Sequence, residues 1–303
     1  MQRLMQKVQV VVLVAFAAGV LAAPLGAQSI VAEGAELKLL ADDFTFTEGP
    51  ATDGKGNVYF TDQPNDAIHV WTVAGELETF LQPAGRSNGL YFAEDGTLWA
   101  CADEHNQLWA IAPDGKHQPV VVNFEGKLLN GPNDLWIHSQ RWLFFTDPFY
   151  KRPYWPADRG PKAQPSEAVY RLDRNTGQVT RMADQFKRPN GIIGDADRGV
   201  LYVADIGANK TYRFKIAEDG TLQQQELFCA QGSDGMTIDR QGNVYLTGGQ
   251  GVSVYSSAGE KLEVIAVPER WTANVTFGGA NHDTLFITAS DSLYSIRTRM
   301  QGI

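Results

Sequence analysis

Short hydrophobic runs recur along the chain, and each follows a turn rich in Gly, Asp and Asn. Six copies lie beyond residue 44: "DGKGNVYFTD" (53–62), "EDGTLWACAD" (94–103), "SQRWLFFTDP" (139–148), "ADRGVLYVAD" (196–205), "RQGNVYLTGG" (240–249) and "NHDTLFITAS" (281–290). β-Branched and aromatic residues leaving a tight turn are typical of a β-strand. The hydrophobic runs begin 40, 45, 58, 43 and 41 residues apart, at Val58, Leu98, Leu143, Leu201, Val244 and Leu285. This spacing is the period of a four-stranded propeller blade.

Further alternating stretches follow each copy, such as "AIHVWT" and "ELETFL" after the first. The sixth copy has only one, because the chain ends at Ile303, whereas the strand-like "AELKLLADDF" (35–44) is left over at the beginning. A propeller ring closes when its first and last segments share a blade, which removes a costly exposed edge. The sequence therefore predicts an all-β, six-bladed β-propeller with four-stranded blades, the last closed by the N-terminal strand. An open β-sandwich, the alternative, explains neither the equal periods nor the missing strand.

Residues 1–27 have the pattern of an export signal. A basic "MQRLMQK" precedes the apolar "VQVVVLVAFAAGVLAA", and "PLGAQS" offers small residues for cleavage after Ala27. We expect a signal peptide over 1–27, a propeller catalytic domain over 28–303, and a periplasmic or secreted protein. An uncleaved membrane anchor is the alternative, although the segment is short and has no basic flank after it.

The charge and cysteine content of the chain limit the kinds of partner and the disulfide bonds to be expected. Removing Arg3 and Lys7 with the signal leaves 24 basic against 35 acidic side chains, a net charge of −11, which disfavours nucleic acid as a partner. No membrane association is expected after cleavage, and the oligomeric state stays open. Cys101 and Cys229 are expected to be two separate buried thiols, although an oxidising compartment would permit pairing.

In each expected blade, one polar residue begins the first strand. It lies 10 or 11 residues before the hydrophobic run that forms the second strand of that blade. These residues are Glu48, Asn88, Asn133, Asn190, Asp234 and Asn274. First strands are innermost in a propeller, so the six side chains should project toward one level of the central channel. Two carboxylates and four amides suit a hard divalent cation, with Ca²⁺ preferred and Mg²⁺ or Mn²⁺ possible. Simple Asx-turns beside the neighbouring glycines are the alternative.

The loops after the second strands should border the same mouth of the channel, because antiparallel strands return to the face where the first strands begin. The segment 148–167 is about 15 residues longer than its counterparts, and we expect it to cover the mouth as a lid. Its aromatic and basic residues could bind a sugar-like ring and an acidic group, or could merely bury themselves. His105 could equally be a surface residue. The candidate substrate-binding residues are Asn88, Asn133, Asp147, Tyr150, Trp271 and His105, and the rim should also contain Gln63, Asp103, Asp205, Arg86, Lys127, Arg188 and Arg270.

"FTEGP", "NGPNDL" followed by "FTDP", "RPNGI" before "LYVAD", and "SDGMTIDRQGNVYLT" together resemble the gluconolactonase/regucalcin (senescence marker protein) family, over roughly residues 44–298. The resemblance implies a six-bladed propeller that hydrolyses sugar-acid lactones with a divalent metal in its channel. It implies that Glu48, Asn190 and Asp234 are metal ligands, that Asn133 is a substrate or fourth metal contact, and that Asp234 is also the catalytic acid/base. One departure is Gly131, where animal members carry an arginine, so that substrate contacts must come from elsewhere, such as the lid.

The predicted function is therefore a metal-dependent hydrolase that opens the lactone ring of a sugar acid. Asp147, Asp205 and His105 are alternatives to Asp234 as the general base, because a metal-bound carboxylate is a weak base. A non-enzymatic propeller binding module and a paraoxonase-like esterase or phosphotriesterase remain alternatives.

Overall fold

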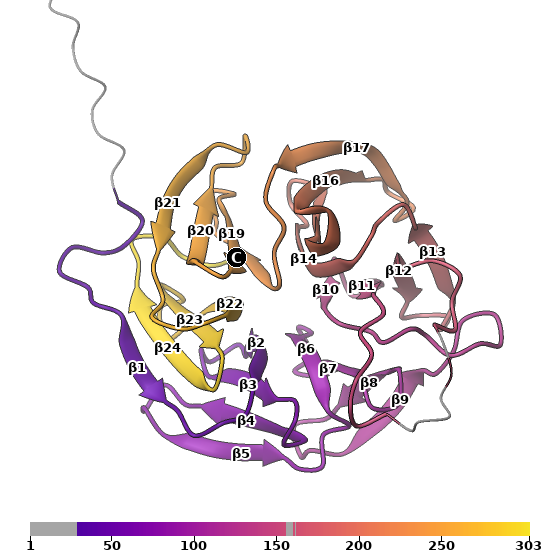
Figure 1. The fold of residues 1–303 in the computed structure, drawn as a ribbon, viewed down its shortest axis with the longest axis horizontal. Coiled ribbons are helices and arrows are strands. Elements are labelled where there is room, and N and C mark those ends of the chain that lie inside the picture. Colours follow the sequence, from indigo (N-terminus) through magenta and orange to yellow (C-terminus); the bar gives the residue numbers. More distant parts are fainter. Residues whose placement is uncertain (1–28, 156–159, 161) are drawn as a thin grey trace, which may run out of the picture.

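The computed structural model describes residues 29–155, 160 and 162–303, and the predicted signal peptide lies outside them. Six four-stranded antiparallel sheets surround a central axis, which confirms the six-bladed β-propeller (Figure 1). Blade 1 contains β2 (Thr47–Thr52), β3 (Val58–Asp62), β4 (Ala67–Trp71) and β5 (Leu77–Leu81), and blade 2 contains β6 (Ser87–Phe92), β7 (Leu98–Ala102), β8 (Gln107–Ile111) and β9 (His117–Val121). Blade 3 contains β10 (Leu135–Ile137), β11 (Trp142–Asp147), β12 (Ala168–Asp173) and β13 (Val179–Ala183).

The second half of the ring repeats this order. Blade 4 contains β14 (Pro189–Asp195), β15 (Val200–Asp205), β16 (Lys210–Ile216) and β17 (Leu222–Cys229), with a short 3₁₀ turn, η1 (Ile206–Ala208), after β15. Blade 5 contains β18 (Met236–Ile238), β19 (Val244–Gly248), β20 (Gly251–Tyr255) and β21 (Lys261–Ile265). Blade 6 contains β22 (Thr272–Gly278), β23 (Thr284–Ala289), β24 (Ser292–Arg297) and, as its outer strand, β1 (Lys38–Ala41).

Blade 6 is closed by the two ends of the chain. β1 pairs antiparallel with β24, with Lys38 opposite Ser295 and Leu39 opposite Tyr294. This pairing confirms the predicted closure by the N-terminal strand. Among the described residues, no helix is long and apolar enough to span a membrane.

Aspartates shape the tight turns between the first and second strands. Asp53 Oδ1 accepts hydrogen bonds from the backbone N–H groups of Lys55 (2.8 Å) and Asn57 (2.9 Å), which fixes an Asx-turn between β2 and β3. Asp239 makes the same pair of bonds between β18 and β19. The polar turns read from the sequence are therefore local hydrogen-bonded units, and each second strand begins within one residue of its predicted start.

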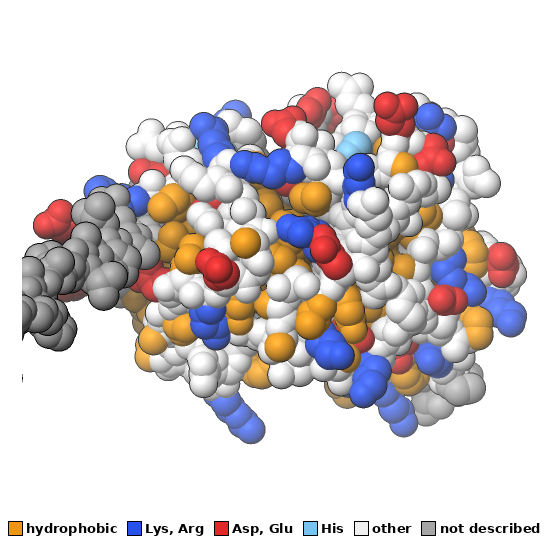
Figure 2. Space-filling model, turned by 90° about the horizontal axis from the view of Figure 1, so that it is seen from above, with side chains coloured by type: hydrophobic (Ala, Val, Ile, Leu, Met, Phe, Trp, Pro, Cys, Tyr) orange, Lys and Arg blue, Asp and Glu red, His pale blue; other side chains and the backbone are white. Residues whose placement is uncertain are grey.

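The hydrophobic core lies between neighbouring blades. β7 and β11 are buried along their whole length, whereas the outer strand β5 is exposed over its first residues. Trp136 of β10 packs in one cluster with Ile192 and Leu201 of blade 4. On the outer strand β21, hydrophobic side chains alternate with charged ones. Figure 2 shows hydrophobic, basic and acidic side chains interspersed on one side of the propeller. Cys101 and Cys229 are both buried free thiols, as expected.

Candidate active site

The six polar residues of the predicted ring lie at the inner ends of their blades, and all are buried, with exposed fractions between 2% and 9%. In four blades the strand register shifts next to the ring residue, and these positions are β-bulges or similar irregularities. A bulge bends a strand and re-aims a side chain. This local geometry turns the ring residues toward the axis in blades 1, 2, 4 and 6, at Glu48, Asn88, Asn190 and Asn274.

Side-chain hydrogen bonds connect ring residues across blade boundaries. Asn274 Nδ2 donates to Glu48 Oε2 (3.1 Å), and Asn190 Nδ2 donates to Asp234 Oδ1 (2.8 Å). These bonds place each carboxylate beside an amide of a neighbouring blade. The four residues therefore form two hydrogen-bonded pairs rather than four separate turns, and the charge of Asp234 acts on Glu48 of the other pair. We call these four residues the polar layer.

Two glycines permit this close approach. A Cβ atom at Gly235 would lie 1.8 Å from Asn274 Cγ, and one at Gly191 would lie 2.5 Å from the carbonyl oxygen of Asp234. The glycine after a ring residue therefore makes room for the next blade at the axis. Simple turn formation does not account for these contacts.

Burial and like charges disfavour ionisation of the carboxylates in this layer. Burial, followed by the negative charges of Asp234 and Asp134, raises the pKa of Glu48 well above its ordinary value. Burial also raises the pKa of Asp234 to about 6, although hydrogen bonds from Trp271 and Asn190 oppose the shift. A nearby cation would relieve this unfavourable electrostatics.

The donor set fits a hard divalent cation. Glu48, Asn190, Asp234 and Asn133 would hold it through carboxylate and amide oxygens, the ligands that Ca²⁺ and Mg²⁺ prefer. Among the residues that the structure describes, no three His, Cys, Asp or Glu side chains form a metal-binding group. The ring contains two carboxylates, so amide oxygens would have to supply the remaining ligands.

Two predicted substrate-binding residues contact the ring directly. Trp271 Nε1 donates to Asp234 Oδ2 (2.6 Å), and the Tyr150 hydroxyl accepts a hydrogen bond from Asn190 Nδ2 (2.8 Å). Burial, together with the charge of Asp234, raises the pKa of the Tyr150 phenol, which stays neutral and can donate its own proton. Tyr150 lies in the predicted lid, so this segment reaches the polar layer.

The lid segment is anchored by Asp103 on a neighbouring blade. Asp103 Oδ2 accepts hydrogen bonds from Arg152 Nε (2.7 Å) and the Tyr154 hydroxyl (2.6 Å), and its carbonyl accepts one from Trp155 Nε1 (3.0 Å). A Cβ atom at Gly131 would lie 2.8 Å from Asp103 Oδ1 and 3.3 Å from the Trp155 ring. The space beside this glycine is thus filled by lid contacts. Tyr154 and Trp155 pack down onto the protein, as the alternative to substrate stacking anticipated.

Asp147, predicted to bind substrate, is fully buried beneath the loop that leads to Asn133. Its two carboxylate oxygens accept hydrogen bonds from the backbone N–H groups of Asn130 (2.9 Å) and Gly131 (2.8 Å). Asp205 binds the backbone N–H groups ahead of Asn190 in the same way. Both aspartates therefore brace loops, and their positions give no support to roles as substrate ligand or general base.

His105 is not brought to the ring. Its side chain is 51% exposed and stacks on Trp109 at a centroid separation of 5.9 Å. Trp109 in turn stacks on His117 of the outer strand β9. His105 therefore lies over the outer part of blade 2, which agrees with the surface alternative.

Asn88 and Asn133 lie in the ring with their side-chain amides making no hydrogen bond to another described residue, whereas their backbone carbonyls are engaged. Gly89 N donates to the carbonyl of Asn133 (2.8 Å), and the Thr61 hydroxyl donates to that of Asn88 (3.1 Å). Their amides remain candidates for contact with a bound molecule.

Sequence reasoning missed a set of threonines on the second strands. Their hydroxyls donate to backbone carbonyls of the next blade at or beside the ring. The pairs are Thr61 with Asn88 (3.1 Å), Thr146 with Asn190 (2.7 Å) and Thr247 with Ala273 (2.7 Å). The repeated threonine in "YFTD", "FFTD" and "YLTG" was the available signal.

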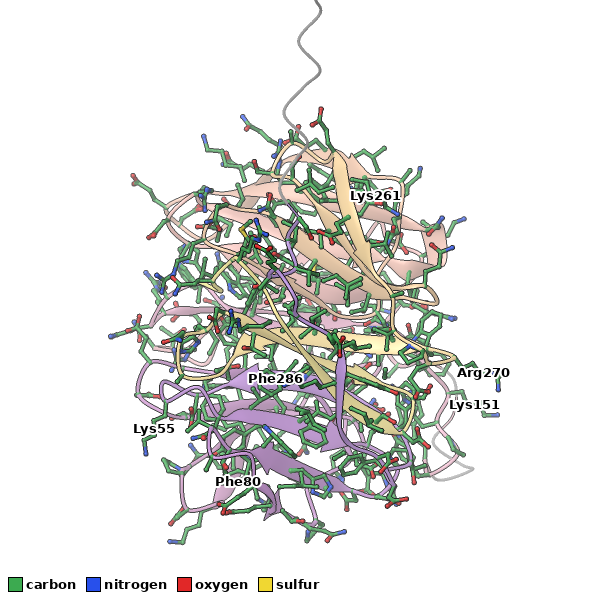
Figure 3. The ribbon with its side chains drawn as sticks, turned by 90° about the vertical axis from the view of Figure 1, so that its left-hand side faces the viewer. Lys55, Phe80, Lys151, Lys261, Arg270 and Phe286 are labelled. Atoms are coloured by element: carbon green, nitrogen blue, oxygen red, sulfur yellow. The ribbon has the colours of Figure 1, made fainter. Side chains whose placement is uncertain are left out.

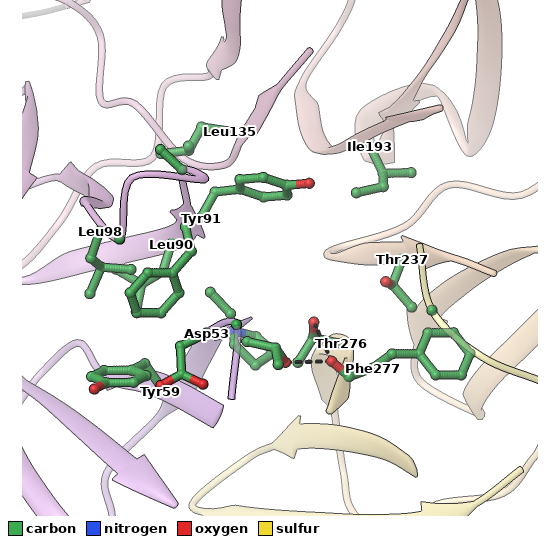
Figure 4. A pocket seen from close by; sticks show the side chains of 18 of the residues that line it. Asp53, Tyr59, Leu90, Tyr91, Leu98, Leu135, Ile193, Thr237, Thr276 and Phe277 are labelled. Carbon is green, nitrogen blue, oxygen red and sulfur yellow. Dashed lines mark hydrogen bonds between the residues drawn. The ribbon is translucent and has the colours of Figure 1, made fainter. Parts of the chain in front are cut away.

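Asp134 was also missed, although it adjoins Asn133. Its Oδ2 accepts a hydrogen bond from Ile192 N of the next blade (3.3 Å), and burial raises its pKa to about 7. Asp134 and Asn274 line a cavity of about 640 Å³ that opens on the opposite face, between the turns that join first and second strands. Figure 4 shows its walls, with Leu90, Tyr91 and Phe277 among the labelled side chains. Among the six ring residues, Asn274 is the one that lines this chamber, so most of the polar layer lies outside it.

The protein is a six-bladed propeller with a site at its central channel. Buried carboxylates and amides form this site, and an aromatic loop reaches it. The chain belongs to the SMP-30/gluconolactonase/LRE-like family, whose model matches residues 46–291.

Similar proteins include a gluconolactonase of Zymomonas mobilis, which is 28% identical over 295 residues, covering 88% of this chain and 82% of that protein. The solved structure of a gluconolactonase from Xanthomonas campestris has 28% identity and a TM-score of 0.81, covering 89% of this chain and 91% of its own. A 6-deoxy-6-sulfogluconolactonase of Pseudomonas putida is 34% identical over 136 residues, covering 39% of this chain and 46% of that protein.

Proposed function

We propose that this protein is an exported, metal-dependent lactonase that hydrolyses the ring ester of a sugar-acid lactone. The observation that carries the proposal is the buried layer in which Asn190 and Asp234 are hydrogen-bonded to each other and are also contacted by Tyr150 and Trp271. Family membership and the lactonase names of similar proteins support the reaction. The pattern of residues 1–27 supports export to the periplasm or the medium.

In the reaction, the oxygen of water adds to the lactone carbonyl carbon, and the ring C–O bond then breaks. The ring oxygen takes up a proton and becomes the hydroxyl group of the open hydroxy acid. A proton acceptor is needed for the attacking water and a proton donor for the leaving oxygen.

We assign Asp234 as the acceptor of the water proton. Of the four candidate bases, Asp234, Asp147, Asp205 and His105, it is the one in the polar layer. Each of its oxygens already accepts one hydrogen bond, from Asn190 and from Trp271, and a carboxylate retains lone pairs for a water proton. Tyr150 can donate a hydrogen bond to a lactone oxygen, because its phenol stays neutral. The amide N–H₂ groups of Asn88 and Asn133 would donate hydrogen bonds to the sugar hydroxyls, which leaves the Asn133 oxygen for the metal.

The metal would be held by Glu48, Asn190, Asp234 and Asn133, and Ca²⁺ suits this irregular set of carboxylates and amides best. When bound, it supplies Lewis-acid polarisation of the ester carbonyl and neutralises the buried carboxylates. The raised pKa values of Glu48 and Asp234 support such a cation.

The experiment is a lactone panel assayed by proton release, with and without chelator, followed by re-addition of Ca²⁺, Mg²⁺ or Mn²⁺. Asp234→Ala should lower kcat by at least about a hundredfold, while exposed Asp197→Ala, which removes the same charge elsewhere, should keep wild-type activity. Retained turnover in Asp234→Ala would refute its role. Full activity after chelation would refute metal dependence.

The same panel separates the alternatives. A binding module would hydrolyse no lactone in any metal, and a phosphotriesterase would prefer aryl phosphates to lactones. Either result would overturn the proposed reaction.

A further inference from the structure

Two guanidinium groups lie against the ring of Tyr150, the lid residue whose hydroxyl contacts the polar layer. The Arg152 and Arg188 Cζ atoms lie 5.0 Å and 4.9 Å from the Tyr150 centroid. Such contacts hold a cation through the negative face of the aromatic ring. Because the Tyr150 hydroxyl also contacts Asn190, a single side chain, that of Tyr150, connects both guanidinium groups to the polar layer.

The two arginines differ in how their charge is balanced. Arg152 pairs with the buried carboxylate of Asp103 at 2.7 Å. Arg188 is exposed and forms no ion pair with any described residue, and Asp205 binds its backbone N–H rather than its guanidinium. Among the residues that the structure describes, no carboxylate therefore balances the charge of Arg188 beside Tyr150.

Hydrogen bonds hold the backbone that carries Arg188. Arg188 is separated from Asn190 only by Pro189, on the loop that Asp205 braces. Tyr150 is fixed from the other side by the lid contacts to Asp103. Lys151 and Arg270 project from the same face of the propeller, whereas Lys55 projects from the opposite face (Figure 3).

We propose that the physiological lactone carries a second, negatively charged group, and that Arg188 binds it beside Tyr150. This inference rests on the proposed lactonase function and narrows its substrate class to anionic sugar lactones. A carboxylate, a sulfonate and a phosphate share the required chemistry, because each accepts paired N–H donors from a guanidinium. The neutral phenol of Tyr150 offers one further donor to the same region.

The test compares D-glucaro-γ-lactone with D-glucono-γ-lactone, which differ only in a carboxylate against a hydroxymethyl group. The measured quantity is the ratio of their kcat/KM values, since this ratio cancels effects common to both substrates. The wild type should prefer the carboxylate lactone, and the preference should fall as NaCl concentration rises. A sulfonate and a phosphate lactone then rank the three anions.

Arg188→Gln should reduce the ratio about tenfold, mainly through KM of the anionic lactone, which corresponds to about 1.4 kcal/mol. Arg188→Lys should retain part of the preference because it keeps the charge. Arg297→Gln removes an equivalent exposed charge from the end of β24 and should leave the ratio unchanged. Circular dichroism of each variant checks the fold.

A wild-type preference for the neutral lactone, or a ratio that changes less than twofold in Arg188→Gln, overturns the inference while leaving the lactonase proposal intact. If the wild type hydrolyses neither lactone, the proposed function fails. In that case, calorimetry compares the binding of glucarate with that of gluconate and tests whether Arg188 selects an anion. Tighter binding of glucarate in the wild type, lost in Arg188→Gln, would support this selection. Equal binding would contradict it.

Discussion

The threonine between blades 3 and 4 provides a sharp test of how the ring is held together. Thr146 is fully buried, and its hydroxyl donates to the carbonyl of Asn190 (2.7 Å) and accepts a hydrogen bond from Asp134 N (3.2 Å). Thr146→Val keeps the shape and the strand preference of the side chain but removes both bonds. The carbonyl of Asn190 loses its threonine donor beside the candidate site.

The expected cost follows from burial. Leaving a buried polar group without its partner costs about 1–3 kcal/mol. Thr146→Val should therefore lower the free energy of unfolding by that amount, which corresponds to a fall in Tm of roughly 2–10 °C in a domain of this size. Because Asn190 belongs to the polar layer, kcat/KM for lactone hydrolysis should fall as well.

Urea denaturation with linear extrapolation measures the free energy of unfolding. Thr288→Val is the matched control, because Thr288 is equally buried but donates to Asn274 of its own blade over a longer distance, 3.3 Å. Its effect should be clearly smaller. A Thr146→Val protein within about 0.5 kcal/mol of the wild type, or equal losses in the two variants, would refute the reasoning.

Three further predictions concern the site and its supports. Tyr150→Phe removes the acceptor for Asn190 Nδ2 and should lower kcat/KM about tenfold with unchanged circular dichroism; wild-type kinetics would contradict this. Asp147→Asn turns an amide N–H₂ toward a backbone N–H and should lower the free energy of unfolding by about 1–3 kcal/mol in denaturant titrations; unchanged stability would argue against the loop-bracing role. Burial raises the pKa of Asp147 from 3.8 to about 7, so the folded state binds its proton more tightly, and its contribution to stability should decrease as pH rises from about 4 to 7. Denaturation midpoints across that range should show a smaller slope in Asp147→Asn, and an equal slope would exclude Asp147 as the source.

The repeat accounts for most of the fold that could be predicted. Each blade is one local unit of turn and alternating strand, so the period and the leftover strand at residues 35–44 determined the number of blades and the closure with β24. The same repeat predicted the polar ring, because one offset from the second strand recurs at one level of the axis.

The remainder of the site depends on contacts between blades, which a single repeat does not contain. The register shifts at Glu48 and Asn190, and the hydroxyl of Thr146, act across neighbouring strands. Asp147 illustrates the difficulty, since an aspartate at a strand end can either face a channel or bind backbone N–H groups. Sequence alone does not distinguish these environments.

The pairing of β1 with β24 has a consequence for biogenesis. Because the outermost strand of the final blade comes from the beginning of the chain, the circle stays incomplete until synthesis has reached residue 297. Contacts between such distant segments form slowly. Completion of blade 6 is therefore a late step in folding, because it needs both the first and the last strands of the propeller.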